Sequence, residues 1–355
     1  MSARQIDKYL QDMLKQSASD LHFISGDPAR ARIHGHLRQL ASETLATDHV
    51  QQCLDEIMDG TTKRVFAEHD AADFAYEIPE ISRFRVNAFR HLNGIGAVFR
   101  AIPAEAITLE DLSMPKIVHE LCRHTQGMIL VTGKTGSGKS TTLAAMIDSM
   151  NRRLKGHILT IEDPIEFVHK AQGCLISQRE VGVHSNSFAD ALHSALREDP
   201  DVILVGEMRD LETISIAVTA AEMGILVMGT LHTNGAGQTV DRIVNSFPAD
   251  KQGHIRTMIS TSLRGVISQQ LLPTKGKPGR IAALEILVNT PAVSNLIRQG
   301  KLDQLETAMQ AGGNLGMQTM DSALMNLVSQ AHISGRDAYQ QANNKSKFER
   351  MRDEP

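Results

Sequence analysis

Residues 133–140 read GKTGSGKS, which is a complete GxxxxGK[ST] loop. The apolar run MILVT precedes this loop, and a helical pattern that begins near Thr141 follows it. Glycines let the backbone wrap closely around a polyphosphate, and the main-chain N–H groups and the helix N-terminus then bind its negative charge. A chance glycine-rich turn is the alternative, but it does not require a strand before it and a helix after it. The loop therefore predicts a nucleotide-binding α/β domain.

The polar residues of the loop have separate predicted tasks. We expect Lys139 to contact the β and γ phosphates and Ser140 to give Mg²⁺ a hard oxygen ligand. ATP and Mg²⁺ are the predicted cofactors, because Mg²⁺ neutralises the charge that develops during phosphoryl transfer. The predicted ATP-binding residues are Gly133, Thr135, Gly136, Ser137, Gly138, Lys139, Ser140 and Thr141.

Short apolar runs alternate with helical patterns in the region around the loop. The runs HILTI, VILVG and ILVMGTL are typical of strands buried on both faces. Between them, residues such as Leu143, Met146, Ile147 and Met150 share one helix face. This alternation predicts a mostly parallel sheet with helices on both sides, which binds ligands at the carboxyl ends of its strands.

Polar residues follow three of these predicted strands. Glu162 comes directly after HILTI, Glu207 after VILVG and His232 after ILVMGTL. Nucleotide turnover needs groups that position water, and Glu162 and Glu207 lie at the strand ends where the loop also emerges. His232 lies where a γ-phosphate could be sensed, although a lone histidine is more often structural or exposed. Acids after strands can also be solvated turn residues or helix caps. Both interpretations stay open for Asp163, Glu166, Asp199 and Asp201.

The chain has 355 residues, enough for two domains and a small third element. At its start, Ile6, Leu10, Met13 and Leu14 predict one face of an amphipathic helix. The run RFRVNAFRHLNGIGAVFRAIP predicts a hairpin with arginines on its strands, and the pattern changes after it. We predict an N-terminal domain at residues 1–101, a linker at 102–112, the P-loop domain at 113–290 and a helical region with a polar tail at 291–355.

Composition argues against several classes of function. The formal net charge of -4 and the aromatic fraction of 4% disfavour stable binding of a nucleic acid, which needs a basic surface or rings that stack on bases. Cys53, Cys122 and Cys174 lie far apart without a CxxC pair, which disfavours a disulfide framework and a thiolate zinc site. No run approaches the ~18 apolar residues of a membrane span, so we expect a cytoplasmic protein.

Four ordered motifs resemble the secretion ATPase superfamily of type IV pili and of type II and type IV secretion, and within it the PilT-type retraction ATPases. The motifs are GSGKSTT, ILTIEDPIEFVH, LREDPDVILVGEMRD and MGTLHT, preceded by RFRVNAFR and GAVFRAIP. The resemblance implies an α/β chain in which a PAS-like α+β N-terminal domain precedes a RecA-like P-loop ATPase domain with a helical C-terminal portion. It also implies assembly into a homo-hexameric ring.

The same resemblance implies roles for individual residues. Glu162 would orient the attacking water, Glu207 would act on Mg²⁺ and water, and His232 would report on the γ-phosphate. Arg85 and Arg100 would act as arginine fingers, with ordinary surface pairing as the alternative. The implied activity is ATP hydrolysis that drives pilus retraction and twitching motility. The implied partners are an inner-membrane platform protein, which would hold the motor at that membrane, and a paralogous pilus ATPase.

The branch of the family is predicted from what this sequence contains. Three scattered cysteines cannot build the four-cysteine zinc element of extension and type II secretion ATPases, which favours the retraction branch. However, Lys134 replaces a proline usual in retraction ATPases, and residues 292–299, AVSNLIRQ, differ at three positions from their AIRNLIRE motif. An accessory nucleotide-binding ring paralogue and an ATPase of a related pilus or secretion system therefore stay open as alternatives. A DNA translocase is disfavoured by the net acidity.

Overall fold

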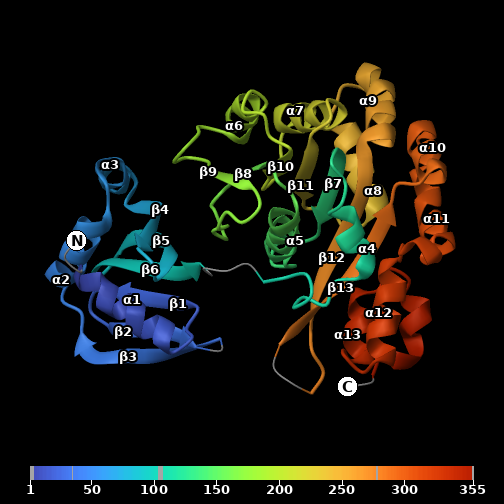
Figure 1. Ribbon diagram of the computed structural model, residues 1–355. Helices are drawn as coiled ribbons and strands as arrows, with labels where there is room; N and C mark the ends of the chain where they lie inside the picture. The colour runs from blue at the N-terminus through green and yellow to red at the C-terminus, as the bar shows by residue number, and fades with distance from the viewer. Residues whose placement is uncertain (1–3, 34, 103–106, 277–278, 354–355) are drawn as a thin grey trace. The chain divides into compact units, whose positions relative to one another are not determined.

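The computed structural model describes residues 4–33, 35–102, 107–276 and 279–353 (Figure 1). The chain divides into two compact units: unit 1 is Met1–Glu105 with Glu166–Val168, and unit 2 is Ala106–Ile165 with His169–Pro355. Residues 103–106 of the predicted linker and residues 354–355 of the predicted tail lie outside the described residues. The domain boundaries at residues 101, 112 and 290 stay predictions.

Unit 1 is a six-stranded antiparallel sheet with the strand order β3-β2-β1-β6-β5-β4. Helices pack on one of its faces and close a hydrophobic core against it (Figure 1). The strands are β1 (Asp20–Ile24), β2 (Pro28–Ile33), β3 (His36–Thr44), β4 (Ala71–Ile78), β5 (Ser82–His91) and β6 (Gly94–Ile102). The helices are α1 (Gln5–Lys15), α2 (Thr47–Ile57) and α3 (Gly60–His69).

The local patterns at the start of the chain form the elements they predict. Ile6, Leu10 and Met13 of α1 are buried in the unit 1 core, and Leu14 packs against its edge. The predicted hairpin joins β5 to β6, with His91 paired to Gly94. In β5 the buried Phe84, Val86 and Ala88 alternate with Arg83 and Arg85, because successive side chains of a strand point to opposite faces. Arg90 lies on the face of the buried residues, where it stacks over the ring of Phe66.

Unit 2 is built on a seven-stranded sheet with the order β13-β12-β7-β11-β10-β8-β9. Its strand pairs are parallel except β12 with β13. The strands are β7 (Gly127–Thr132), β8 (His157–Glu162), β9 (Leu175–Glu180), β10 (Val202–Val205), β11 (Leu226–Leu231), β12 (Leu263–Pro273) and β13 (Arg280–Val288). Every residue of β7, β10 and β11 is buried, as the apolar runs predict for strands covered on both faces.

Helices cover both faces of this sheet (Figure 1). One face packs against α4 (Lys116–Leu121) and α5 (Lys139–Arg153). The opposite face packs against α6 (Phe188–Ala195), α7 (Leu211–Glu222), α8 (Ala236–Asn245), α9 (Ala249–Ser262), α10 (Pro291–Gln299) and α11 (Leu305–Ala311). The two faces draw on alternate residues of the same strands; Met128 and Leu130 of β7 face one core, and Ile129 and Val131 face the other.

The end of the chain forms a small core of its own in unit 2. Leu272 of β12 and Ala283 of β13 pack there against the last helices, with Phe348 fully buried among them. These helices are α12 (Met320–Ser329), α13 (Gly335–Gln341) and the 3-10 helix η3 (Lys345–Met351). Two further 3-10 helices, η1 (Leu302–Gln304) and η2 (Gly313–Leu315), flank α11. The region after residue 290 is therefore helical, as its pattern indicates.

Candidate nucleotide site

The GKTGSGKS loop leaves the interior of the unit 2 sheet. β7 lies between β11 and β12 and ends at Thr132, directly before Gly133. The helix that follows, α5, begins at Lys139 rather than near Thr141, so Lys139 and Ser140 both lie in its first turn. The first N–H groups of a helix have no partner within it and carry its positive dipole end. The loop therefore presents a binding place for an anion.

Two glycines of the loop cannot carry a side chain. Gly133 has φ +140°, and a Cβ there would lie 2.3 Å from the main-chain oxygen of Gln269. Gly138 has φ +89°, and a Cβ there would lie 2.7 Å from Nε2 of the same glutamine. These separations are shorter than any van der Waals contact, and both φ values belong to the left-handed region. The tight loop thus requires glycine at both positions.

The polar groups of the loop fit a phosphate ligand. Lys139 is only 9% exposed, and its Nζ donates to the carbonyl oxygens of Gly133 at 2.9 Å and Lys134 at 3.2 Å. The Ser137 hydroxyl is buried and has no hydrogen-bond partner within the described part of the chain. Because buried polar atoms normally have partners, an unpaired hydroxyl inside a loop of amides fits a ligand that brings oxygen atoms.

The remaining predicted loop residues lie near the surface. Ser140 and Thr135 are exposed, as is Gly136, and Thr141 is half-buried. Gly136 has φ +79°, again in the left-handed region, with open space where a Cβ would stand. Their accessibility leaves the Ser140 hydroxyl free to meet an oxygen-liganded cation at the helix N-terminus.

The sheet brings the predicted acids and histidine to the edge from which the loop emerges. Val205 of β10 pairs with Ile161 of β8, and Leu231 of β11 pairs with Thr132 of β7. These four strands are parallel neighbours, so their carboxyl ends lie side by side. Glu162 is the last residue of β8, Glu207 follows β10 and His232 follows β11.

Glu207 lies among basic side chains. Its Oε1 accepts from Nε of Arg209 at 2.5 Å and lies 3.0 Å from Nε2 of His232. Burial alone would raise the pKa of Glu207, but the Arg209 hydrogen bond and the charges of His232, Arg209 and Lys139 outweigh burial and lower it. Glu207 is therefore anionic at neutral pH, and its carboxylate is available to a cation or a water. Arg209 was not among the residues predicted from the sequence.

Glu162 is fixed by its own strand and by the next one. Its Oε1 accepts from the Thr160 hydroxyl at 2.6 Å and from Nε2 of Gln178 on β9 at 3.2 Å. Thr160 is fully buried, so this part of the arrangement is rigid. The Glu162 side chain is half-buried at the strand end, where it can reach solvent.

A cross-strand pair that the sequence did not reveal anchors the loop after His232. The N–H of Gly235 donates to Oγ of Ser268 on β12 at 2.8 Å, and the N–H of Ala236 donates to Oε1 of Glu285 on β13 at 2.8 Å. Ser268 and Glu285 are paired residues of neighbouring strands. Burial raises the pKa of Glu285, and Glu306 and Asp321 raise it further against the lowering effect of its N–H donors.

Of the four acids that were open to two interpretations, Asp201 has a structural explanation. Its Oδ2 accepts the main-chain N–H of His157 at 2.8 Å and thereby ties the start of β8 to the segment before β10. This lies at the amino ends of the strands, away from the loop. Asp201 is therefore a backbone cap.

Arg85 and Arg100 lie on unit 1, where they are cross-strand partners on β5 and β6. Nε of Arg100 donates to Oδ1 of Asp20 at 2.9 Å, and Nη2 of Arg85 lies 3.9 Å from Oδ1 of Asp73. Both side chains remain substantially exposed, Arg100 at 67% and Arg85 at 46%. The surface pairing considered as an alternative is thus present within unit 1, and the finger role stays a prediction.

The described residues contain no group of three or more His, Cys, Asp or Glu side chains that could hold a metal ion. The cysteines are free and buried. Burial raises the pKa of Cys53 to about 11 and that of Cys122 to about 12, so neither is a reactive thiolate. Among the described helices, none is both long and apolar enough to span a bilayer.

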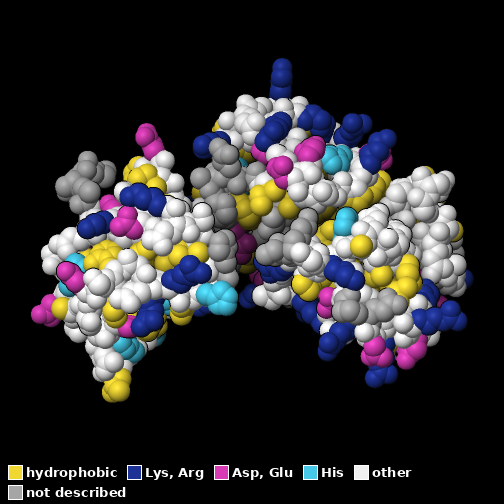
Figure 2. All heavy atoms as spheres, turned by 90° about the horizontal axis from the view of Figure 1, so that it is seen from below, with side chains coloured by type: hydrophobic (Ala, Val, Ile, Leu, Met, Phe, Trp, Pro, Cys, Tyr) yellow, Lys and Arg dark blue, Asp and Glu magenta, His cyan; other side chains and the backbone are white. Residues whose placement is uncertain are grey.

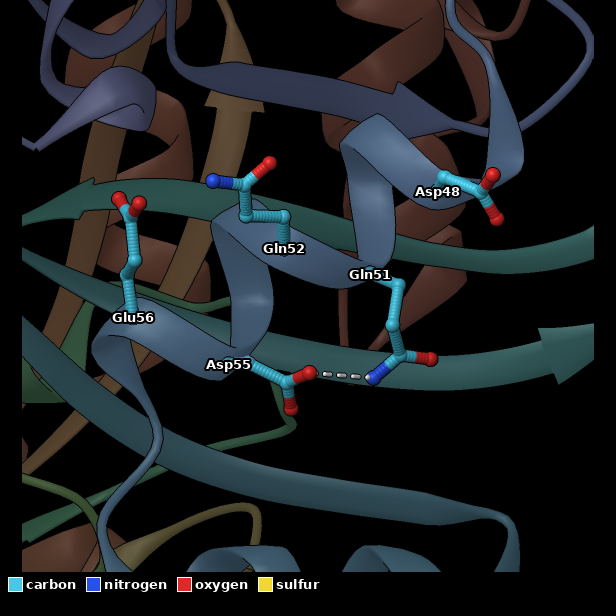
Figure 3. A pocket seen from close by; sticks show the side chains of 5 residues that line it. All are labelled: Asp48, Gln51, Gln52, Asp55 and Glu56. Carbon is cyan, nitrogen blue, oxygen red and sulfur yellow. Dashed lines mark hydrogen bonds between the residues drawn. The ribbon is translucent and has the colours of Figure 1, made fainter.

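A surface hollow lies on α2 of unit 1 (Figure 3). Its walls are polar side chains of this single helix, and Gln51 donates to Asp55 at 3.1 Å within it. The residues that line it are Asp48, Gln51, Gln52, Asp55 and Glu56. Its three carboxylates would repel a phosphate.

The fold and the site together define a P-loop nucleotide-binding protein with acidic groups on the strands beside the loop. The family model described as "Type II/IV secretion system protein" matches residues 1–336. The chain belongs to this family, as the four sequence motifs predicted.

Individual relatives agree with this assignment. The chain is 50% identical over 337 residues to the type IV pilus retractation ATPase PilT of Pseudomonas aeruginosa, covering 95% of this chain and 98% of that protein. It is 50% identical over 332 residues to a twitching motility protein of Neisseria gonorrhoeae, covering 92% and 89% of the two chains. The crystal structure of the pilus retraction motor PilT with bound ADP superposes with a TM-score of 0.91 and 43% identity, covering 97% and 98%. The predicted α/β fold, with an N-terminal domain and a RecA-like ATPase domain, is confirmed.

Proposed function

We propose that this chain is a Mg²⁺-dependent ATPase that drives retraction of a type IV pilus. The observation that carries the proposal is the meeting of the GKTGSGKS loop with Glu162, Glu207 and His232 at one sheet edge. It is supported by 50% identity to a retraction ATPase over nearly the full length of both chains. In the related crystal structure the bound nucleotide is ADP, which agrees with a nucleotide site in this fold.

In the proposed site, the chain binds the triphosphate with main-chain amides and one cation. Lys139 exchanges its two carbonyl partners for the β and γ phosphates, and the unpaired Ser137 hydroxyl gains a phosphate oxygen. Ser140 and the anionic Glu207 are the residues that would hold Mg²⁺. When bound, this ion neutralises the charge that builds on the phosphate oxygens.

The residues around the phosphates have different roles in hydrolysis. Glu162, held by Thr160 and Gln178, orients the attacking water and accepts its proton. His232 responds to the γ-phosphate through its contact with Glu207. Arg85 and Arg100 supply positive charge to the transition state as arginine fingers.

The motor works as a homo-hexamer peripheral to the inner membrane, where it acts on a pilus platform protein and can cooperate with a paralogous pilus ATPase. Its output is twitching motility. The prediction that it binds no nucleic acid stably is kept. On the face of unit 2 shown in Figure 2, Lys and Arg side chains lie among Asp and Glu side chains, and the net charge is -4.

Deleting the gene in the organism that encodes it, and counting surface pili, tests the direction of force. A retraction motor predicts surplus pili that do not retract and cells that do not twitch, with rescue by the wild-type gene and none by Glu207→Gln. Cells without pili would indicate an extension motor instead. Normal retraction in the deletion strain, together with negligible turnover by the purified chain, would establish an accessory role.

A further inference from the structure

Gln269 of β12 contacts the phosphate loop at two points and the helix after it at a third, although more than a hundred residues separate them in the chain. Its Nε2 donates to the main-chain oxygen of Ser137 at 2.7 Å. Its Oε1 accepts from the hydroxyl of Thr142, in the first turn of α5, at 2.8 Å. The main-chain oxygen of Gln269 lies next to Gly133, so that a Cβ on Gly133 would be only 2.3 Å from this oxygen. Gln269 is 3% exposed, so this side chain is a part of the interior rather than of the ligand surface.

These contacts fix the direction of a peptide that a phosphate would use. In a planar trans peptide the carbonyl and the following N–H point in opposite directions. Gln269 draws the Ser137 carbonyl towards β12, and the N–H of Gly138 therefore points away from β12. Without this donor the peptide could rotate, because Gly138 tolerates almost any backbone conformation. An oxygen directed at the phosphates would then repel them.

We propose that Gln269 is a positioning residue for the nucleotide: it holds the amides of the phosphate loop ready for a polyphosphate without touching the ligand. This inference rests on the proposed ATPase function. Its two hydrogen bonds use both ends of one amide, so no other side chain of this length satisfies both partners. A methionine keeps the volume but makes neither bond, and a glutamate can only accept, which places negative charge against the Ser137 oxygen.

The matched control is Gln270, the next residue of the same strand. Its side chain points to the opposite face of the sheet, and its Oε1 has no hydrogen-bond partner among the residues described. Gln270→Met therefore makes the same chemical change on the same strand without touching the loop.

The experiment measures binding of a fluorescent ADP analogue and the KM and kcat for ATP in the purified full chain. We expect Gln269→Met to weaken ADP binding and to raise KM roughly 10-fold, with kcat at saturating ATP within about twofold of wild type. The Gln269→Glu variant should bind the ADP analogue more weakly than the Gln269→Met variant does. Gln270→Met should match wild type in binding and turnover.

A second variant separates the two hydrogen bonds from packing. Thr142→Val keeps the branched shape of a residue that is 1% exposed and replaces only its hydroxyl with a methyl group. We expect a KM increase of roughly threefold, and the Thr142→Val, Gln269→Met double variant should resemble Gln269→Met alone, because both changes act through one side chain. This variant carries the test if Gln269→Met does not fold.

The proposal is overturned if Gln269→Met and Thr142→Val bind the ADP analogue as tightly as wild type, or if Gln270→Met loses as much affinity as Gln269→Met. In either case wild-type turnover would persist, and the proposed function would stand. If the wild-type chain itself neither bound nor hydrolysed ATP, the proposed ATPase function would be wrong, and the role of Gln269, which rests on it, would be wrong as well.

Discussion

Arg100 has two candidate roles that predict different consequences of its removal. In unit 1 it donates to Asp20, whose side chain is only 7% exposed. As an arginine finger it would also stabilise charge on the transferring phosphate. Arg100→Ala therefore tests both roles at once, and the structure allows the size of the structural part to be worked out.

The structural cost of Arg100→Ala is small. A hydrogen bond to a charged group contributes about 1.5–3 kcal/mol. Here Arg100 is 67% exposed, so solvent screens the pair. Asp20 also keeps the Ser19 hydroxyl at 2.7 Å and Arg32 at 3.8 Å as partners. We therefore expect Arg100→Ala to lower the free energy of unfolding by about 1 kcal/mol.

The catalytic cost of the same change would be far larger. An arginine finger contributes a factor of about 10³–10⁵ to the rate. Asp20→Asn is the matched control, because it breaks the same ion pair and leaves Arg100 in place. We expect Arg100→Ala to lose at least ~10²-fold in kcat with ADP affinity unchanged, and Asp20→Asn to retain wild-type kcat. Equal losses of turnover in the two variants, or undiminished turnover in Arg100→Ala, would refute the finger role.

The control variant also has a pH signature. Burial by itself would raise the pKa of Asp20, but the hydrogen bonds from Ser19 and Arg100 and the charges of Arg100 and Arg32 lower it. The unfolded chain therefore takes up this proton at a higher pH than the folded chain, and the stability that Asp20 contributes is lost as the pH falls below about 4. When the free energy of unfolding is measured by denaturation at a series of pH values, Asp20→Asn should lose less stability than wild type as the pH falls. The same dependence on pH in both proteins would contradict the pairing of Asp20 with Arg100.

Three further predictions follow from the site. Lys139→Ala should abolish binding of a fluorescent ATP analogue and all turnover, because it removes the cation that meets the phosphates; retained turnover would exclude this loop as the site. Glu162→Gln should lower kcat ~10²- to 10⁴-fold with nucleotide affinity unchanged, since it removes a base and not a binding group; a change confined to KM would contradict that role. Glu285→Ala should cost about 2 kcal/mol in chemical denaturation, because the N–H groups of Ala236 and Met320 lose their buried acceptor; unchanged stability would show that water replaces it.

The phosphate loop and the acids beside it could be predicted because each is marked locally. GKTGSGKS matches a motif whose residues bind phosphate, and Glu162 and Glu207 directly follow apolar runs that are typical of buried strands. The parallel sheet then brings the ends of β7, β8, β10 and β11 together without any further information. For these residues, short-range pattern and sheet topology are sufficient to predict their positions, and their roles stay predictions.

The supporting groups could not be predicted, because their partners lie far away in the chain. Gln269 of β12 contacts a loop that precedes it by more than a hundred residues, and Ser268 of the same strand contacts Gly235, 33 residues earlier; no sequence pattern relates either residue to its partner. The pairing of Arg100 with Asp20 likewise crosses 80 positions. Tertiary hydrogen bonds of this kind depend on strand order, which apolar periodicity does not specify.

One comparison decides whether ATP bound at the loop is hydrolysed with the help of Glu207. Steady-state ATP turnover and ATP-analogue binding are measured side by side for the wild-type chain and Glu207→Gln in the presence of Mg²⁺. We expect the variant still to bind the analogue but to lose turnover at least ~10²-fold. Turnover by Glu207→Gln at the wild-type rate would contradict it.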